Sequence, residues 1–93
     1  MAKTIRVEQS HNKDPKEVRS RTEAVLSDMA SKYDLKITWT SDTKVEIARS
    51  GVSGWAEILP DKVVVELKLS FPVSALAGKV EERLRAKMSK ELS

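Results

Sequence analysis

Residues 49–55 read RSGVSGW, with two serines and two glycines between an arginine and a tryptophan. A loop of this composition binds phosphate where a strand precedes it and a helix follows, because the backbone amides and the helix dipole then face the anion. Here alternating polar and apolar residues flank the stretch on both sides, which is the pattern of half-buried strands. The stretch therefore predicts the tip of a β-hairpin, with Arg49, Gly51 and Gly54 as a hairpin motif.

The two glycines of this motif have different expected tasks. Gly51 forms a two-residue turn with Ser50 and supplies a positive φ angle, which glycine adopts without steric cost. Gly54 falls on the buried face of the following strand, where the missing side chain leaves room for a helix to approach.

Two consecutive turns give registers that agree with each other. A turn at Ser50-Gly51 pairs Val45 with Ala56, and a turn at Pro60-Asp61 pairs Ala56 with Val65. Both registers keep the apolar side chains on one face of the sheet and the polar ones on the other. Because the two hairpins are consistent, the segment predicts an antiparallel meander.

Strand and helix patterns extend this meander in both directions. Alternation predicts strands in residues 4–8, 35–40, 44–48, 52–59 and 63–69, and helical spacing predicts helices in residues 14–33 and 73–92. The order is β-α-β-β-β-β-α, an α+β fold with an antiparallel sheet and both helices on one face, in a reduced helix-grip arrangement. We expect the first strand to add beside the strand of residues 61–69.

The helices carry recognisable boundary residues. Asp14 is a suitable N-cap, Pro15 fits the first helical position, and Glu17 completes a pattern like a capping box. The last helix is expected to begin at Val73 and to run for about five turns. Gly78 within it predicts a kink or a close packing contact.

Length and composition favour a single domain that covers residues 1–93. Charged residues make up 33% of the chain and hydrophobic residues 40%, the balance of an ordinary globular protein. Cysteine is absent, and neither a signal-peptide pattern nor an apolar run long enough to span a bilayer is present. We therefore expect a cytoplasmic protein without a transmembrane segment.

The charge pattern argues against a nucleic-acid interface. The net charge is +3, and the excess of basic residues lies mainly in residues 78–93. Elsewhere basic and acidic residues are interleaved, whereas a nucleic-acid footprint gathers basic groups on one face. A regulator that contacts nucleic acid is accordingly the weakest of the functional alternatives.

No set of residues predicts catalysis. His11 is the one histidine, and we expect it to be a solvated loop residue because no cysteine or second histidine can join it in a metal or nucleophile site. The carboxylates of the sheet have basic neighbours, which is typical of solvated ion pairs rather than of a general acid and base. We expect a non-enzyme that binds no metal and no cofactor.

Two groups of apolar residues are candidate binding sites. The register places Trp55 on the face away from the helices with Val64 diagonal to it, and Leu59 lies further along. This small patch predicts a partner-binding surface, including a homodimer through the open sheet face. Single exposed aromatic residues are also common without any function.

The second candidate is a pocket between the long helix and the sheet. A deep cavity lined by Trp39, Leu67 and Leu84 would suit a small apolar ligand. The apolar stripe of the helix could instead lie on a membrane or granule surface, but the buried face of the sheet needs a cover, which favours packing.

Residues 35–92 resemble a family of small bacterial proteins, the polyhydroxyalkanoic acid system proteins. The resemblance rests on RSGVSG at residues 49–54, VVVEL at 63–67, LSF at 69–71, SAL at 74–76 and the charged helix that begins near Gly78. The N-terminal strand and the helix of residues 14–33 also fit. The resemblance implies a link to polyhydroxyalkanoate storage and transfers no catalytic residue.

This resemblance orders the functional hypotheses. The first is a non-catalytic accessory protein that binds polyhydroxyalkanoate granules or granule-associated proteins. The alternative is a carrier of a small apolar ligand, a lipid or a hydroxyacyl group, in a pocket between helix and sheet.

Overall fold

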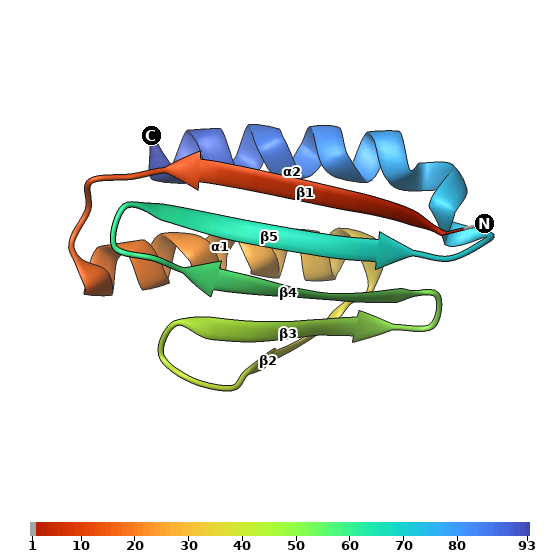
Figure 1. Cartoon of the computed structure of the whole chain (residues 1–93), viewed down its shortest axis with the longest axis horizontal. Helices are drawn as coiled ribbons and strands as arrows, with labels where there is room; N and C mark the ends of the chain where they lie inside the picture. Colours follow the sequence, from red (N-terminus) through yellow and green to blue (C-terminus); the bar gives the residue numbers. More distant parts are fainter. Residues whose placement is uncertain (1) are drawn as a thin grey trace.

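Five antiparallel strands form one sheet, and both helices pack against one of its faces (Figure 1). The computed structural model describes residues 2–93. In chain order the elements are β1 (Lys3–Ser10), α1 (Pro15–Tyr33), β2 (Lys36–Trp39), β3 (Lys44–Arg49), β4 (Val52–Ile58), β5 (Lys62–Leu69), the 3₁₀ helix η1 (Val73–Leu76) and α2 (Ala77–Leu92). The predicted α+β fold and its order of elements are confirmed.

The order of strands in the sheet is β1-β5-β4-β3-β2. Val45 pairs with Ala56 and Ala56 pairs with Val65, so both predicted hairpin registers are confirmed. β1 adds beside β5, as expected, with Ile5 opposite Leu67. The parity of the strands therefore sends one set of apolar side chains toward the helices.

Helix α1 begins and ends as its sequence predicts. The Asp14 carboxylate accepts a hydrogen bond from the Glu17 backbone N–H at 3.0 Å, which satisfies one of the free amides of the first turn. The Glu17 carboxylate pairs with Arg21 at 3.5 Å. The helix ends at Asp34, which takes the left-handed conformation with φ 58°.

The start of the last helical segment differs from the prediction. Residues 73–76 form the 3₁₀ helix η1, and α2 begins only at Ala77. Ala75 N–H donates to the Pro72 carbonyl at 3.1 Å, the three-residue spacing of a 3₁₀ helix, and Ser74 N–H donates to the Ser70 carbonyl at 3.0 Å. The close contact expected at Gly78 is wrong, because an added Cβ there would meet no atom within 4 Å.

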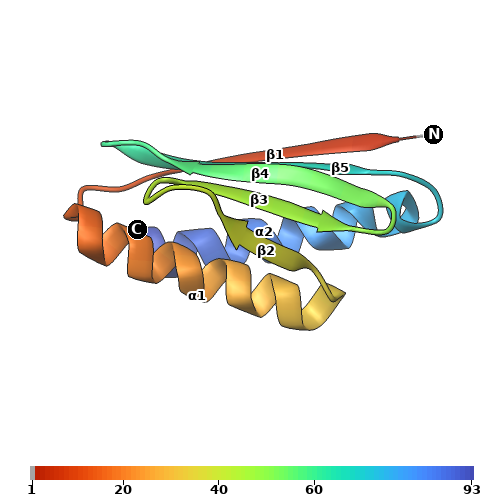
Figure 2. The same cartoon turned by 90° about the horizontal axis from the view of Figure 1, so that it is seen from below.

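The core lies between the sheet and the helix layer, which Figure 2 shows edge-on. In the same view β2 bends out of the sheet toward α1. The core is built from aliphatic and methionine side chains of both layers, among them Val18, Met29, Val45, Ala56, Leu84 and Met88. Thr22 is buried with them, and its hydroxyl has no hydrogen-bond partner among residues 2–93.

A bidentate ion pair joins the two helices. Arg83 Nε and Nη2 donate to the two carboxylate oxygens of Asp28 at 2.9 and 3.0 Å. The hydrogen bond with Arg83, supported by the charge of Lys87, lowers the pKa of Asp28 below its ordinary value. This pair fixes the position of α2 relative to α1 on the solvent side of the helix layer.

The first and last described segments lie at opposite ends of a body that measures 38 × 24 × 19 Å (Figure 1). Lys3 pairs with Leu69, beside the connection to η1. Glu91 forms an ion pair with Arg21 in the first turns of α1, at the other end. Within residues 2–93, no helix is both long and apolar enough to cross a membrane.

Candidate functional site

The hairpin motif forms the tip predicted for it. Gly51 has φ +84°, and its carbonyl accepts a hydrogen bond from Ser70 N–H at 2.8 Å. The tip therefore packs against the connection from β5 to η1. The expected role of Gly54 is wrong: an added Cβ would lie 2.3 Å from the Glu66 carbonyl oxygen and 2.7 Å from Leu67 Cδ2. Gly54 leaves room for the neighbouring strand β5 and not for a helix.

The structure places Trp39, Leu67 and Leu84, the residues of the predicted pocket, in three different surroundings. Leu84 is fully buried in the core between α2 and the sheet. Trp39 lies beside a shallow depression next to α1, and Leu67 borders a different cavity. Trp39 therefore lies against α1, whereas Leu84 lies in the core between α2 and the sheet.

A cavity does open at one end of the helix–sheet interface. We call it the end cavity; its volume is about 200 Å³. Its apolar walls come from α1–β2 and β4 on one side and from β5, η1 and α2 on the other. These walls include Leu35, Val52, Leu67, Leu69, Val73 and Val80. The cavity lies between the end of α1, the hairpin end of the sheet and the start of α2.

Two polar residues, Tyr33 and Arg49, border the end cavity. Arg49 Nη1 donates a hydrogen bond to the Tyr33 carbonyl at 2.8 Å, and Nε donates to the Ser50 carbonyl at 3.2 Å. These bonds tie the hairpin tip to the last residue of α1. The exposed guanidinium is therefore held at the edge of an apolar cavity.

Exposed hydrophobic residues continue from the end cavity to the surface. Phe71 is 76% exposed and Leu76 is 45% exposed, and Pro72 between them is also exposed. We call these three residues the apolar tip. Residues 69–78 contain no charged side chain in a chain that is 33% charged, so the apolar tip is not interrupted by charges of its own segment.

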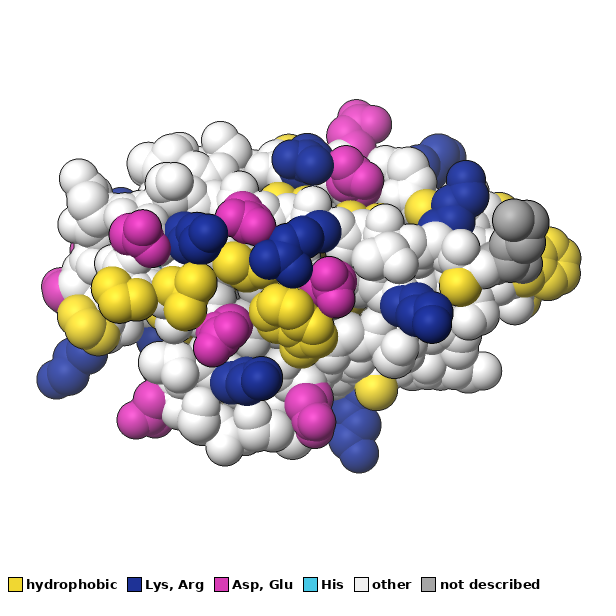
Figure 3. Space-filling view, in the orientation of Figure 1, with side chains coloured by type: hydrophobic (Ala, Val, Ile, Leu, Met, Phe, Trp, Pro, Cys, Tyr) yellow, Lys and Arg dark blue, Asp and Glu magenta, His cyan; other side chains and the backbone are white. Residues whose placement is uncertain are grey.

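The sheet face away from the helices carries the other predicted surface. Figure 3 shows this face, on which a row of hydrophobic side chains is flanked by basic and acidic ones. Trp55 lies there, opposite Glu46 and Glu66 as the register predicts, and it is half-buried. Val64 is only 3% exposed, so its assignment to an exposed patch is wrong. Neighbouring side chains on the sheet cover it.

Ion pairs on this face explain why little apolar surface remains. Arg6 pairs with Glu8 at 3.0 Å and with Glu66 at 3.3 Å, and its guanidinium carbon lies 5.9 Å from the centre of the Trp55 ring. Lys62 pairs with Glu8 at 2.9 Å. The hydrogen bond from Lys62, and to a smaller extent the one from Arg6, lowers the pKa of Glu8. A homodimer through this face stays a prediction.

Leu59, the third residue of that predicted surface, lies in the turn between β4 and β5. Its carbonyl is 2.9 Å from His11 Nε2, while Lys13 N–H donates to His11 Nδ1 at 3.3 Å. Nδ1 accepts, so Nε2 carries the proton that bonds the Leu59 carbonyl. His11 is thus half-buried and holds this turn to the loop before α1, rather than being a solvated loop residue.

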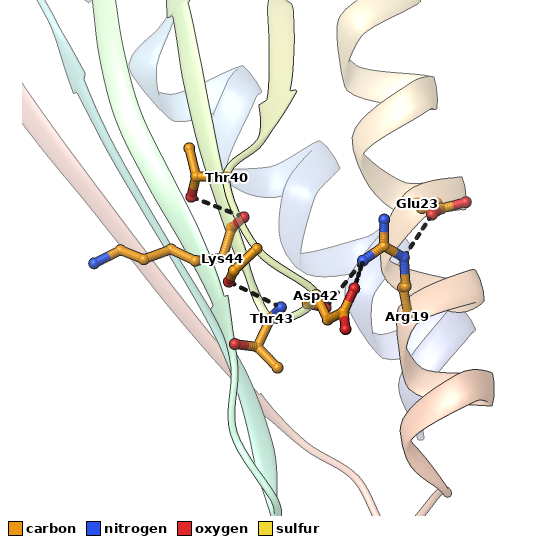
Figure 4. A network of polar contacts seen from close by, with 7 residues as sticks. Arg19, Glu23, Thr40, Asp42, Thr43 and Lys44 are labelled. Atoms are coloured by element: carbon orange, nitrogen blue, oxygen red, sulfur yellow. Dashed lines mark hydrogen bonds and ion pairs between the residues drawn. The ribbon is translucent and has the colours of Figure 1, made fainter.

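A polar network at the far end fixes β2 and its turn against α1 (Figure 4). Arg19 Nε donates to Glu23 at 3.1 Å, and Nη1 donates to the Asp42 carbonyl at 3.2 Å. The Arg19 guanidinium carbon also lies 4.0 Å from the centre of the Trp39 ring. Through this cation–π contact, Trp39 helps to hold the end of β2 against α1.

The sequence analysis missed the end cavity and the apolar tip. Two features of the sequence could have indicated them, namely the uncharged run of residues 69–78 and the position of Arg49 beside a turn. Within residues 2–93 no group of three His, Cys, Asp or Glu side chains is placed to hold a metal ion.

Comparison with protein families identifies the family of this chain. A family model described as "Putative polyhydroxyalkanoic acid system protein" matches residues 5–92, nearly the whole chain. The match confirms the resemblance that residues 35–92 carry. A comparison with curated proteins finds no match.

Proposed function

Because the chain belongs to the polyhydroxyalkanoic acid system protein family, we propose that it is a non-catalytic accessory protein that binds the surface of polyhydroxyalkanoate granules in the cytoplasm. The observation that carries this proposal is the exposure of Phe71 and Leu76 in the apolar tip. A polyester granule presents an apolar surface, and burial of such side chains against it is favourable.

The placement of the apolar tip supports this assignment. Its residues stand in the connection between β5 and α2, outside the packed core, so they can be covered without unfolding the protein. The other candidate surface is less suited to an apolar polymer, because Trp55 lies between Glu46 and Glu66 and under Arg6, which is itself ion-paired.

The chemistry of the end cavity supports a non-catalytic role. Its ionisable residues are Tyr33 and Arg49, and neither a nucleophile with an adjacent base nor a pair of carboxylates lines it. We therefore expect the purified protein not to hydrolyse a hydroxyacyl thioester. Any hydrolysis that a single substitution in this chain abolished would contradict this expectation.

Binding to protein-free polyhydroxybutyrate particles tests the granule proposal. The purified protein should co-sediment with the particles, and the double variant Phe71→Ser, Leu76→Ser should bind at least about tenfold more weakly because it removes the two exposed apolar contacts. Trp55→Thr is the matched control, since threonine suits a strand and the change lies on the opposite surface.

Two outcomes would contradict the proposal. Loss of binding in Trp55→Thr with full binding in the double variant would place the contact on the sheet face. Binding to native granules but not to protein-free particles would mean that a granule protein, and not the polymer, is the partner.

Carriage of a small apolar ligand is the second candidate function. The end cavity favours it, because about 200 Å³ of space with apolar walls opens beside the surface. For comparison, an apolar cavity of about 150 Å³ is large enough to bind benzene.

A further inference from the structure

Arg49 differs from the other arginines in its electrostatic partners. Of the six arginines, Arg6, Arg19, Arg21, Arg83 and Arg85 each form an ion pair with a carboxylate within the described part of the chain. Arg49 forms none with residues 2–93, and its described hydrogen bonds go to the carbonyls of Tyr33 and Ser50. Its positive charge is therefore left without a counter-charge at the edge of the end cavity.

The guanidinium is also fixed in place. Its two carbonyl partners belong to different elements, the end of α1 and the β3–β4 turn, so the side chain spans the gap between them. A guanidinium has five N–H donors, and those not used by carbonyls remain for a ligand. A planar fork of donors suits a carboxylate, which accepts two parallel hydrogen bonds.

We infer that the end cavity binds the acyl chain of a short-chain or medium-chain carboxylate, with the carboxylate on Arg49. This inference rests on the proposed carrier function and names its ligand class. The walls exclude water from an alkyl chain, while Arg49 at the edge supplies a cation that borders the cavity. A hydroxyalkanoate shares this chemistry with an ordinary fatty acid.

The volume limits the length of the chain. A water molecule occupies about 30 Å³ in the liquid, and a methylene group is of similar size. A cavity of about 200 Å³ therefore holds some six or seven such groups. The cavity therefore fits a chain of about six carbons, and longer chains would extend past Leu76 toward the apolar tip.

Titration of the ¹⁵N-labelled protein with octanoate and with octanamide tests the inference by NMR. The two probes share one chain, and only octanoate is charged. We expect both to shift amides around residues 49–52 and 73–80, with octanoate binding at least about tenfold more tightly. From butyrate to hexanoate, affinity should rise about fourfold per methylene group and then flatten.

Variants separate the charge from the cavity. Arg49→Gln should weaken octanoate binding about tenfold and leave octanamide binding unchanged, whereas Arg85→Gln, a matched change on an exposed face of α2, should affect neither. Val73→Phe places a larger side chain in the cavity and should weaken both probes. The comparison of the two probes on the unaltered protein needs no variant, so it decides the matter even if Arg49→Gln does not fold.

The outcomes distinguish this inference from the functions on which it builds. Equal binding of octanamide and octanoate in the cavity would overturn the carboxylate assignment and keep the carrier function. Shifts that are absent, or that Val73→Phe leaves unchanged, would overturn the carrier function and the inference together. Granule binding is independent, because Phe71→Ser should reduce it and keep octanoate binding, while Arg49→Gln should do the reverse.

Discussion

Gly54 lies within a strand and Gly78 within a helix, and the space around the two glycines differs: Gly54 is crowded, whereas Gly78 has no atom within reach of an added methyl group. A methyl group at Gly54 would overlap the backbone of β5, with the Glu66 carbonyl oxygen 2.3 Å away. A methyl group at Gly78 would extend into open space at the start of α2. The same substitution should therefore have effects of opposite sign at the two positions.

Gly54→Ala should lower the free energy of unfolding by about 1–3 kcal/mol, because β5 has to move to admit the methyl group. Gly78→Ala should raise it by about 0.5 kcal/mol through better helix propensity. Urea denaturation followed by circular dichroism measures both changes, with the m value as a check on the two-state transition. A Gly54→Ala protein as stable as the parent would contradict the close approach of β4 to β5.

Val64 shows that the alternation of side chains along a strand predicts the face on which a residue lies but not how exposed it is. The register assigned it to the correct face of the sheet, because side chains alternate strictly along a strand. Its exposure depends on how Arg6, Glu8 and other long side chains lie across that face, and they lie over apolar surface while their charges reach water. Two of the ion pairs of these side chains, Arg6 with Glu66 and Glu8 with Lys62, form only once β1 is beside β5.

At the scale of elements, β2 is the shortest strand of the sheet and pairs with one neighbour, β3. It has four residues, and it forms the edge of the sheet. Because β2 makes few backbone hydrogen bonds, contacts from Arg19 on α1 add to its stability. Arg19 bonds the Asp42 carbonyl in the following turn and covers the ring of Trp39. We expect the edge to loosen when this side chain is removed.

Arg19→Ala should lower the free energy of unfolding by about 1 kcal/mol, from the lost cation–π contact and a partly exposed ion pair. In a Trp55→Phe background, acrylamide quenching of the Trp39 fluorescence should increase, because the guanidinium no longer covers the ring. Glu23→Gln is the control, with a change within about 0.5 kcal/mol. Unchanged quenching in Arg19→Ala would show that the packing of Trp39 does not depend on Arg19.

The elements could be predicted from the sequence far better than the cavity between them. Turn residues at Ser50-Gly51 and Pro60-Asp61 set the parity of three strands, so registers followed directly. The end cavity depends on distances between α1, η1 and the hairpin tip, which no local pattern encodes. The change from an expected α-helix to η1 is instead a local feature, in which Ala75 N–H donates to the Pro72 carbonyl three residues back.

At the scale of the whole molecule, the pair of Asp28 and Arg83 couples the helix layer to pH. The pKa of Asp28 is lower in the folded chain than its ordinary value of 3.8, mainly through the hydrogen bonds from Arg83. The unfolded chain therefore binds a proton more readily than the folded chain in this range. The stabilisation is complete above about pH 3.8 and is lost as the pH falls through the lower folded-state pKa.

Asp28→Asn should accordingly reduce stability at neutral pH and make the decline in acid shallower than in the parent. Urea midpoints from about pH 6 to about pH 3 provide the measurement. Glu82→Gln, a neutralisation of an exposed glutamate on the same face of the helix layer, should leave the steepness of the acid decline as it is. Parallel declines in the parent and in Asp28→Asn would show that this pair does not contribute to acid unfolding.

The two ends of the molecule are unequal in a way that matters for imaging in living cells. The apolar tip, the end cavity and the start of β1 share one end, whereas Ser93 follows α2 at the other (Figure 1). If the apolar tip docks on a granule as we propose, a fluorescent protein fused after Ser93 would stand clear of that surface, at the far side of a body 38 Å long. The same reporter fused before β1 would sit beside Phe71 and obstruct the contact, so the choice of fusion terminus is itself a probe of orientation on the granule.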